Sequence, residues 1–196
     1  SAEGRFGGEG VERFCGTTWP QLFILPGMKE KKFARFRQPT PDEQEVLIHL
    51  VVEPIPPEAV ERFDQLLAQH HYLKDARLVG EHLRYVATYR GQWLALAAWS
   101  AAALHLKARD QFVGWTDEQR RTRLPLLVNN SRLLVLPDGQ CPNLISRFMK
   151  LMLGRLSADW QQGWGHPVAL AETFVDPHLY QGTADKASCW HRLGQT

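Results

Sequence analysis

The amino-acid sequence predicts an α+β domain in which a mixed β-sheet is flanked by helices, and three observations lead to this class. Residues 82–103 form two apolar runs around Arg90-Gly91, the pattern of a β-hairpin. The run 132–136 is apolar at every position, as in a central strand. A glycine-containing turn, an amphipathic helix over 143–160 and a strand over 168–176 follow it.

Composition places the chain among ordinary globular proteins. Of its 196 residues, 44% are hydrophobic and 22% are charged. No apolar run approaches the ~18–20 residues that a membrane span needs, and the N-terminus lacks the pattern of a signal peptide. Cys15, Cys141 and Cys189 are too scattered for a disulfide framework or a CxxC zinc site. We therefore expect a cytoplasmic protein without a membrane partner.

Residues 1–50 are expected to be an N-terminal linker or partial module, and residues 51–196 the main domain. The first 20 residues are glycine-rich, Leu22 to Leu25 predicts a short strand, and Val46 to Val52 predicts another. Between them lies a basic segment whose cations are Lys29, Lys31, Lys32, Arg35 and Arg37.

The basic segment supports two interpretations. Five cations stand against one acid, and Phe33 and Phe36 lie among them, as suits phosphate contacts with base stacking. The alternative is a solvated amphipathic segment that turns both aromatic rings into the core. Nucleic acid is the partner that the first interpretation predicts.

Helix signals are strong at two further places. Pro56 and Pro57 precede a predicted helix over 57–70, and Thr116 begins another as the N-cap of a capping box with Gln119. His70 and His71 point in different directions on a helix, so we predict an ordinary helix end and no metal site there. Likewise Arg109 and Asp110 are adjacent, and we expect each to find another partner.

The strand over 168–176 carries two acids on one face. Glu172 and Asp176 are four residues apart, about 13 Å at ~3.3 Å each, which is too far for one metal ion or a close acid–base pair. Glu172 lies among apolar neighbours, where burial would raise its pKa and make it a candidate base. Asp176 ends the strand and is either reactive or a cap for the following loop.

Several sequence blocks resemble the family of the Druantia anti-phage protein DruA. The most specific are Asn129-Asn-Ser-Arg132 and Glu172-Thr-Phe-Val-Asp176, and His71-Tyr-Leu73, Arg109-Asp110, Asp159-Trp160 and Gly182-Thr183 accompany them in the same order. The resemblance runs from about residue 60 to the end. It implies an anti-phage defence role beside other defence subunits.

A more distant resemblance is to Mom-like DNA-modifying proteins of the GNAT acyltransferase superfamily. It implies a GNAT-like sheet, acetyl-CoA or another acyl-CoA as cofactor, and a C-terminal truncation, because a GNAT sheet needs further strands after Thr196. By this resemblance Asp176 lies at the reaction centre. The cofactor would be gripped at the strand end and the following turn, by Leu134, Val135, Leu136, Gly139 and Asn143.

The chain departs from this pattern in the same region. Only Gly139 remains of the two spaced glycines usual in a GNAT turn, and Asp185 stands where the Mom-like motif carries a tyrosine. An exposed aspartate with a pKa near 4 is ionised at neutral pH, whereas a phenol with a pKa near 10 keeps its proton. Asp185 is therefore a third catalytic candidate beside Asp176 and Glu172, but it would not be a proton donor at neutral pH as the tyrosine would.

Three functions are therefore compatible with the sequence. The first is a GNAT-like domain that acts on or binds nucleic acid with acyl-CoA. The second is a catalytically inert nucleic-acid-binding subunit that uses Lys29 to Arg37. The third is a transposase-like nuclease that uses Asp110, Asp159 and Glu172 with magnesium.

Overall fold

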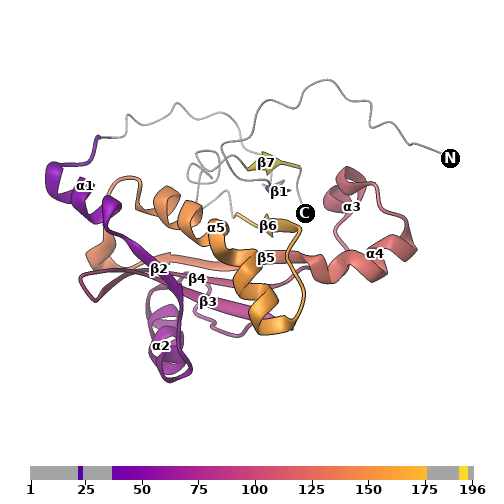
Figure 1. Ribbon diagram of the computed structural model, residues 1–196, viewed down its shortest axis with the longest axis horizontal. Coiled ribbons are helices and arrows are strands. Elements are labelled where there is room, and N and C mark those ends of the chain that lie inside the picture. The colour runs from indigo at the N-terminus through magenta and orange to yellow at the C-terminus, as the bar shows by residue number, and fades with distance from the viewer. Residues whose placement is uncertain (1–21, 24–36, 176–189, 194–196) are drawn as a thin grey trace.

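A five-stranded mixed sheet forms the centre of the computed structural model, which describes residues 22–23, 37–175 and 190–193 (Figure 1). For 22–23 and 191–192 only the backbone is described. The strand order is β2-β3-β4-β5-β6, with bounds Val51–Pro54, His82–Tyr89, Gln92–Ala101, Leu127–Val135 and Leu170–Thr173. A separate parallel pair consists of β1 (Leu22–Phe23) and β7 (His191–Arg192). The predicted mixed sheet is confirmed.

Five α-helices accompany the sheet in the described residues: α1 Pro41–Ile48, α2 Val60–His70, α3 Lys107–Val113, α4 Asp117–Arg123 and α5 Leu144–Trp164. Short 3₁₀ turns occupy Pro57–Ala59, Leu124–Leu126 and Pro137–Gly139. Within the described part of the chain, none of these helices is long and apolar enough to cross a bilayer.

The β3–β4 hairpin agrees with its prediction. Its strands join through Arg90 and Gly91, whose φ angles of 49° and 79° are those of a primed turn that follows the strand twist. The pairs β2–β3, β3–β4 and β4–β5 are antiparallel, and β5–β6 is parallel. The sheet therefore has a single parallel step, at β5 and β6.

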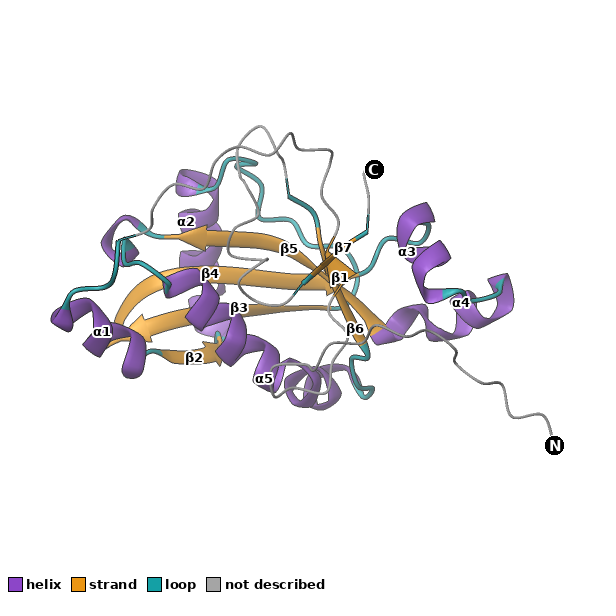
Figure 2. Cartoon of the chain, turned by 90° about the horizontal axis from the view of Figure 1, so that it is seen from above, coloured by secondary structure: helices purple, strands orange, loops and turns teal. Residues whose placement is uncertain are grey.

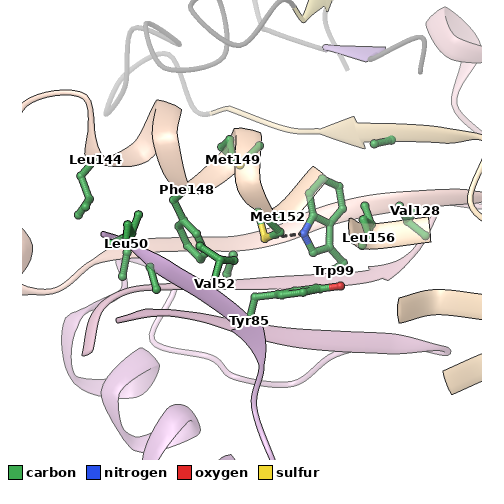
Figure 3. Packing of buried hydrophobic residues seen from close by; sticks show 14 of the residues in the cluster. Leu50, Val52, Tyr85, Trp99, Val128, Leu144, Phe148, Met149, Met152 and Leu156 are labelled. Atoms are coloured by element: carbon green, nitrogen blue, oxygen red, sulfur yellow. Dashed lines mark hydrogen bonds between the residues drawn. The ribbon is translucent and has the colours of Figure 1, made fainter. Parts of the chain in front are cut away.

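Helices α5 and α2 cover opposite faces of the sheet (Figure 1), and each face carries its own apolar core. On one face α5 packs against β3 and β4, where the Trp99 indole N–H donates to Met152 Sδ at 3.0 Å (Figure 3). On the other face, Phe63 and Leu67 of α2 are fully buried against β3 and β4. The amphipathic patterns of both helices predicted these contacts.

The strand expected at 46–52 is wrong in its first half. Thr40 and Glu43 form a capping box that starts α1, and β2 begins only at Val51. The Glu43 carboxylate accepts from the Thr40 N–H at 2.8 Å, and the Thr40 hydroxyl accepts from the Glu43 N–H at 3.3 Å. This capping outweighs the β-branched character of residues 46–48.

Two arginines of α5 bind the backbone of neighbouring segments. Arg147 Nε donates to the Leu47 carbonyl at 3.0 Å, and Arg155 Nη1 donates to the Val52 carbonyl at 2.7 Å. The second bond covers part of the backbone of edge strand β2, which reduces its capacity to pair with another chain.

A helical insertion separates β4 from β5. Residues 102–126 carry α3 and α4, which project beyond one end of the sheet (Figure 2). The predicted capping box at Thr116 is present, with the Thr116 hydroxyl accepting from Gln119 N–H at 3.2 Å. Antiparallel neighbours usually join through a few residues, so this insertion is an added feature of the domain.

Candidate functional site

The parallel strands β5 and β6 pair over only four residues and then separate. Their register runs from Leu127 opposite Leu170 to Asn130 opposite Thr173, where β6 ends while β5 continues to Val135. Residues 131–135 therefore have β4 on one side and, among the described residues, no strand on the other. All five are half-buried. We call this separation of β5 from β6 the opening; in the described part of the chain it leaves one backbone edge of residues 131–135 without a partner strand.

A β-bulge marks the point of separation. Ala98 pairs with Arg132 and Trp99 with Asn130, so Ser131 is the extra residue. The Ala98 carbonyl accepts from both Asn130 Nδ2 and Ser131 Oγ, each at 3.3 Å. The polar block Asn129 to Arg132, which the sequence singled out, therefore builds the branch point of the sheet.

One flank of the opening is fastened by Arg132 of β5. Its Nε donates to the Asp75 carbonyl at 2.7 Å and its Nη2 to the Arg77 carbonyl at 3.3 Å. These bonds hold residues 71–81, which connect α2 to β3, against β5. Arg132 is opposite Ala98, which lies in the α2-side core, so this flank is on the face opposite α5.

His71 anchors the start of that connection. It ends α2 as predicted and is buried, and its Nδ1 accepts from the Leu73 N–H at 3.2 Å. Burial, and next the positive charge of Arg132, lower the pKa of His71 to about 4. The ring is therefore neutral at pH 7, with its proton on Nε2.

The other flank is fastened by a buried ion pair between β6 and α3. Glu172 and Arg109 are each 1% exposed, and Arg109 Nη1 lies 3.2 Å from Glu172 Oε2. The Glu172 carboxylate also accepts from the Ala103 N–H at 3.3 Å, and Arg109 donates to the Ala103 carbonyl at 2.8 Å. Burial raises the pKa of Glu172, and the charge of Arg109 opposes this rise. The sequence correctly placed Glu172 on a strand but did not predict its pairing with Arg109.

The expectation that Arg109 and Asp110 find separate partners is wrong. Arg109 Nη2 lies 2.8 Å from Asp110 Oδ1, because the α3 turn lets the long arginine fold back. Asp110 also accepts from the Leu106 N–H at 3.2 Å and pairs with Arg120 of α4 at 3.5 Å. Burial would raise the Asp110 pKa, but these donors hold it below its ordinary value. The insertion is thus tied to β6 through one charge network.

The acids Asp110, Asp159 and Glu172 do not form the metal site that the nuclease hypothesis requires. In the part of the chain that the structure describes, no three His, Cys, Asp or Glu side chains are grouped to hold a metal ion. Asp159 instead accepts from the Tyr85 hydroxyl at 2.7 Å and from Arg155 at 2.6 Å. The third hypothesis is therefore not supported by this structure.

The turn between β5 and α5 approaches β4 closely. A Cβ added to Gly139 would lie 2.2 Å from the Leu94 carbonyl oxygen, so only glycine fits there. The Gly139 N–H donates to the Leu136 carbonyl, and the Leu136 N–H to the Leu94 carbonyl, both at 2.9 Å. The packing of this turn accounts for the glycine.

The α5 N-terminus presents an electropositive end without a side-chain cap. Asn143 occupies the N-cap position in a left-handed conformation, with φ 66°, and its side chain makes no capping bond. The first turn contains no acidic residue. Its backbone N–H groups and the helix dipole therefore favour an anion.

The remaining predicted site residues are placed as follows. Leu134 packs with the α2-side core and Val135 with the α5-side core, and both pair with β4 in the part of β5 that β6 does not reach. Arg37 forms an exposed ion pair with Glu43, whose pKa this partner and the Thr40 N–H lower to about 2. The other calls lie outside the described residues: Lys29, Lys31, Lys32, Arg35, Asp176 and Asp185.

The architecture has a solved counterpart among acetyltransferases. It is similar to AAC(6')-Iy, a GNAT acetyltransferase solved with the bisubstrate analog CoA-S-monomethyl-acetylneamine. The match has a TM-score of 0.51 at 10% identity and covers 76% of this chain and 95% of the other. The fold is therefore GNAT-like, as the sequence resemblance implied.

A comparison with protein-family models identifies the family of this chain. The model described as Druantia protein DruA matches residues 26–193, most of the chain. The chain belongs to the Druantia protein DruA family, and it is thus a component of an anti-phage system with other subunits. No curated protein matches the sequence.

Proposed function

We propose that this protein is an acyl-CoA-dependent acyltransferase of a Druantia system that acts on nucleic acid. The observation that carries the proposal is the separation of β5 from β6 after Asn130 and Thr173. Among the described residues it leaves one edge of 131–135 without a partner strand, and the turn over 136–143 connects this stretch to the α5 N-terminus. An extended amide-containing chain that ends in phosphates fits such an edge and helix end.

In the proposed site, β5 would bind the pantetheine part of acyl-CoA and the α5 N-terminus would bind its pyrophosphate. The backbone of Val135 would hydrogen-bond a pantetheine amide, as an additional strand would, because the Leu136 N–H is directed at β4 and successive residues alternate between the two edges of a strand. Leu134, whose backbone faces β4, would support this edge through its packing with the α2-side core. The first turn of α5, after Asn143, would receive the pyrophosphate, because no acid lies there to repel it. Leu136 and Gly139 would set the path of the turn through their bonds to each other and to Leu94.

The bound acyl-CoA supplies an activated acyl group as a thioester. Asp176, three residues beyond Thr173, remains our candidate for the reaction centre, together with Asp185, nine residues later in the sequence. Glu172 is the weaker candidate base, because Arg109 and the Ala103 N–H already occupy its oxygens. We propose that Glu172 positions the strand that leads to Asp176.

The nucleic-acid part of the proposal draws on the basic segment. Lys29, Lys31, Lys32, Arg35 and Arg37 supply five cations within nine residues, enough for a salt-sensitive phosphate contact. Nucleic acid and the other Druantia subunits are therefore the proposed partners, and the cytoplasm is the proposed location.

A second candidate function is a catalytically inert subunit that binds nucleic acid through the same basic segment. The ion pairing of Glu172 favours it, because this acid is removed from general base chemistry. The two candidates differ in whether the opening beside β5 takes acyl-CoA.

A thermal-shift titration with acetyl-CoA tests the first function. A ligand at 100 times its Kd adds about 2.7 kcal/mol of stability, so a clear rise in Tm is expected. Ser146→Glu places a carboxylate in the first turn of α5, where the helix dipole stabilises it but phosphates are repelled. We expect this variant to fold normally and lose the shift, while Ser146→Gln keeps it.

The result that contradicts the acyltransferase is equally clear. If wild-type protein shows no shift at millimolar acetyl-CoA, or if Ser146→Glu and Ser146→Gln respond equally, the proposed cofactor site is wrong. Retained salt-sensitive binding of DNA would then support the inert subunit.

A further inference from the structure

Residues 72–77, beside the opening, form a short exposed segment that has no role in the proposed acyl-CoA site. Tyr72 and Leu73 follow α2 and are 44% and 47% exposed, and Lys74 is also exposed. Arg77 lies three residues further on, with its side chain 90% exposed. An aromatic ring and two cations are therefore presented to solvent within six residues.

The local charge balance is positive. Residues 71–80 contain one acid, Asp75. Its carboxylate lies 3.3 Å from Arg77 Nε and 3.9 Å from Arg132 Nη2. Arg77 and Arg132 thus share one carboxylate, and Lys74 makes no ion pair with any of the described residues. The exposed part of the segment keeps a net attraction for anions.

This segment is held in place rather than loosely attached. Arg132 binds the carbonyls of Asp75 and Arg77, and the Lys74 N–H donates to the His71 carbonyl at 2.9 Å. Because Arg132 belongs to the part of β5 that has separated from β6, the segment lies along the flank of the opening. A molecule bound to it would lie beside the part of β5 that the proposed cofactor site uses.

Lys74 has an unusual backbone conformation for its residue type. Its φ of 47° is left-handed, a conformation that glycine or asparagine adopts at less cost than lysine. The position therefore carries a lysine where local geometry favours another residue, which is consistent with a role for the side chain.

We propose that Tyr72, Leu73, Lys74 and Arg77 form a docking surface for single-stranded nucleic acid. An exposed tyrosine can stack on a base only if that base is unpaired, and the two cations suit the phosphates of one strand. The surface deepens the proposed function, on which it rests, by naming an unpaired strand as the substrate presented to the opening.

Fluorescence anisotropy with a labelled 20-nucleotide single-stranded DNA and its duplex tests this surface. Wild-type protein is expected to prefer the single strand, and Tyr72→Ala to weaken that binding about tenfold while Tyr72→Phe keeps it. Lys74→Asn removes a cation yet suits the left-handed backbone, so weaker binding cannot reflect misfolding. It should also reduce the salt slope by about 0.7, the value for one phosphate contact with a single strand.

Two matched controls complete the experiment. Lys74→Arg should bind like wild type, and so should Lys150→Gln, which removes one exposed charge from α5 on the other face of the sheet. The inference is overturned if Tyr72→Ala and Lys74→Asn bind the single strand like wild type, if the duplex binds equally well, or if wild-type protein binds neither. The acetyl-CoA shift, which Lys74→Asn should leave intact, reports separately on the proposed acyltransferase.

Discussion

Two arginines fasten the two flanks of the opening, and they do so with different chemistry. Arg109 holds the α3–α4 insertion to β6 through a carboxylate, and both charged groups are 1% exposed. Arg132 holds the connection after α2 to β5 through neutral carbonyls, and its side chain is 13% exposed. One flank thus depends on a buried charge pair, and the other on hydrogen bonds near the surface.

The stability of the two flanks therefore depends on their arginines to different degrees. Removing one member of a buried pair leaves the other charged and dehydrated, whereas removing Arg132 leaves carbonyls that water can reach. The α3–α4 insertion should therefore unfold only together with the whole domain. The segment after α2 can be loosened while the rest of the domain remains folded.

The largest effect is expected from breaking the buried pair. Arg109→Met leaves Glu172 buried without its main cation and should reduce the free energy of unfolding by about 3–5 kcal/mol. The double variant Arg109→Met with Glu172→Met should recover much of this loss, because no buried charge remains. Urea unfolding of the two single variants and the double variant measures it. A double variant no more stable than Arg109→Met would contradict this account.

A smaller and more local effect is expected at the other flank. Arg132→Met should cost about 1–3 kcal/mol, because it removes hydrogen bonds to the Asp75 and Arg77 carbonyls. Hydrogen exchange should accelerate at residues 74–78 and remain unchanged in α3. Equal acceleration in both regions would show that the two flanks are not independent.

A pH effect follows from His71 on the Arg132 flank. Because its folded pKa of about 4 lies below the ordinary 6.5, the unfolded chain binds the proton first as pH falls. The contribution of His71 is complete above pH 6.5 and is lost between pH 6.5 and 4, on the order of 3 kcal/mol. Comparing urea unfolding of wild type and His71→Gln across this range isolates it. Parallel pH profiles for the two proteins would count against a buried neutral His71.

The smallest effects separate two adjacent asparagines at the branch point. Asn130 donates to the Ala98 carbonyl, so Asn130→Leu should destabilise by about 1–2 kcal/mol. Asn129 Oδ1 is buried and has no hydrogen-bond partner among the described residues, so Asn129→Leu should be neutral or slightly stabilising. Thermal melting of both variants checks the order of their stabilities. The reverse order would mean that the bulge does not depend on Asn130.

Local sequence patterns predicted much of the fold. The turn at Arg90-Gly91, the helix over 57–70 and the apolar stripe of α5 each rest on neighbouring residues, and all three are confirmed. The capping box at Thr40 was missed because the β-branched residues that follow favoured a strand. The start of β5 was missed because a bulge makes Asn129 to Ser131 polar where a central strand is normally apolar.

The site was less predictable, because it depends on distant contacts. The apolar neighbours of Glu172 correctly indicated its burial, but no local pattern links it to Arg109, 63 residues earlier. Similarly, nothing near Arg132 indicates that it binds carbonyls at Asp75 and Arg77. The one available signal was a charged residue in an otherwise apolar strand, which requires a partner when it is buried.

Hydrogen exchange measured with and without acetyl-CoA tests the central claim most directly, since it locates the ligand on the chain. If acyl-CoA occupies the opening, the backbone amides of residues 131–135 and of the first turn of α5 should become protected, while those of α2 and α4 stay unchanged. Protection absent from both 131–135 and the α5 N-terminus, at an acetyl-CoA concentration that saturates a shift in Tm, would contradict the proposed site.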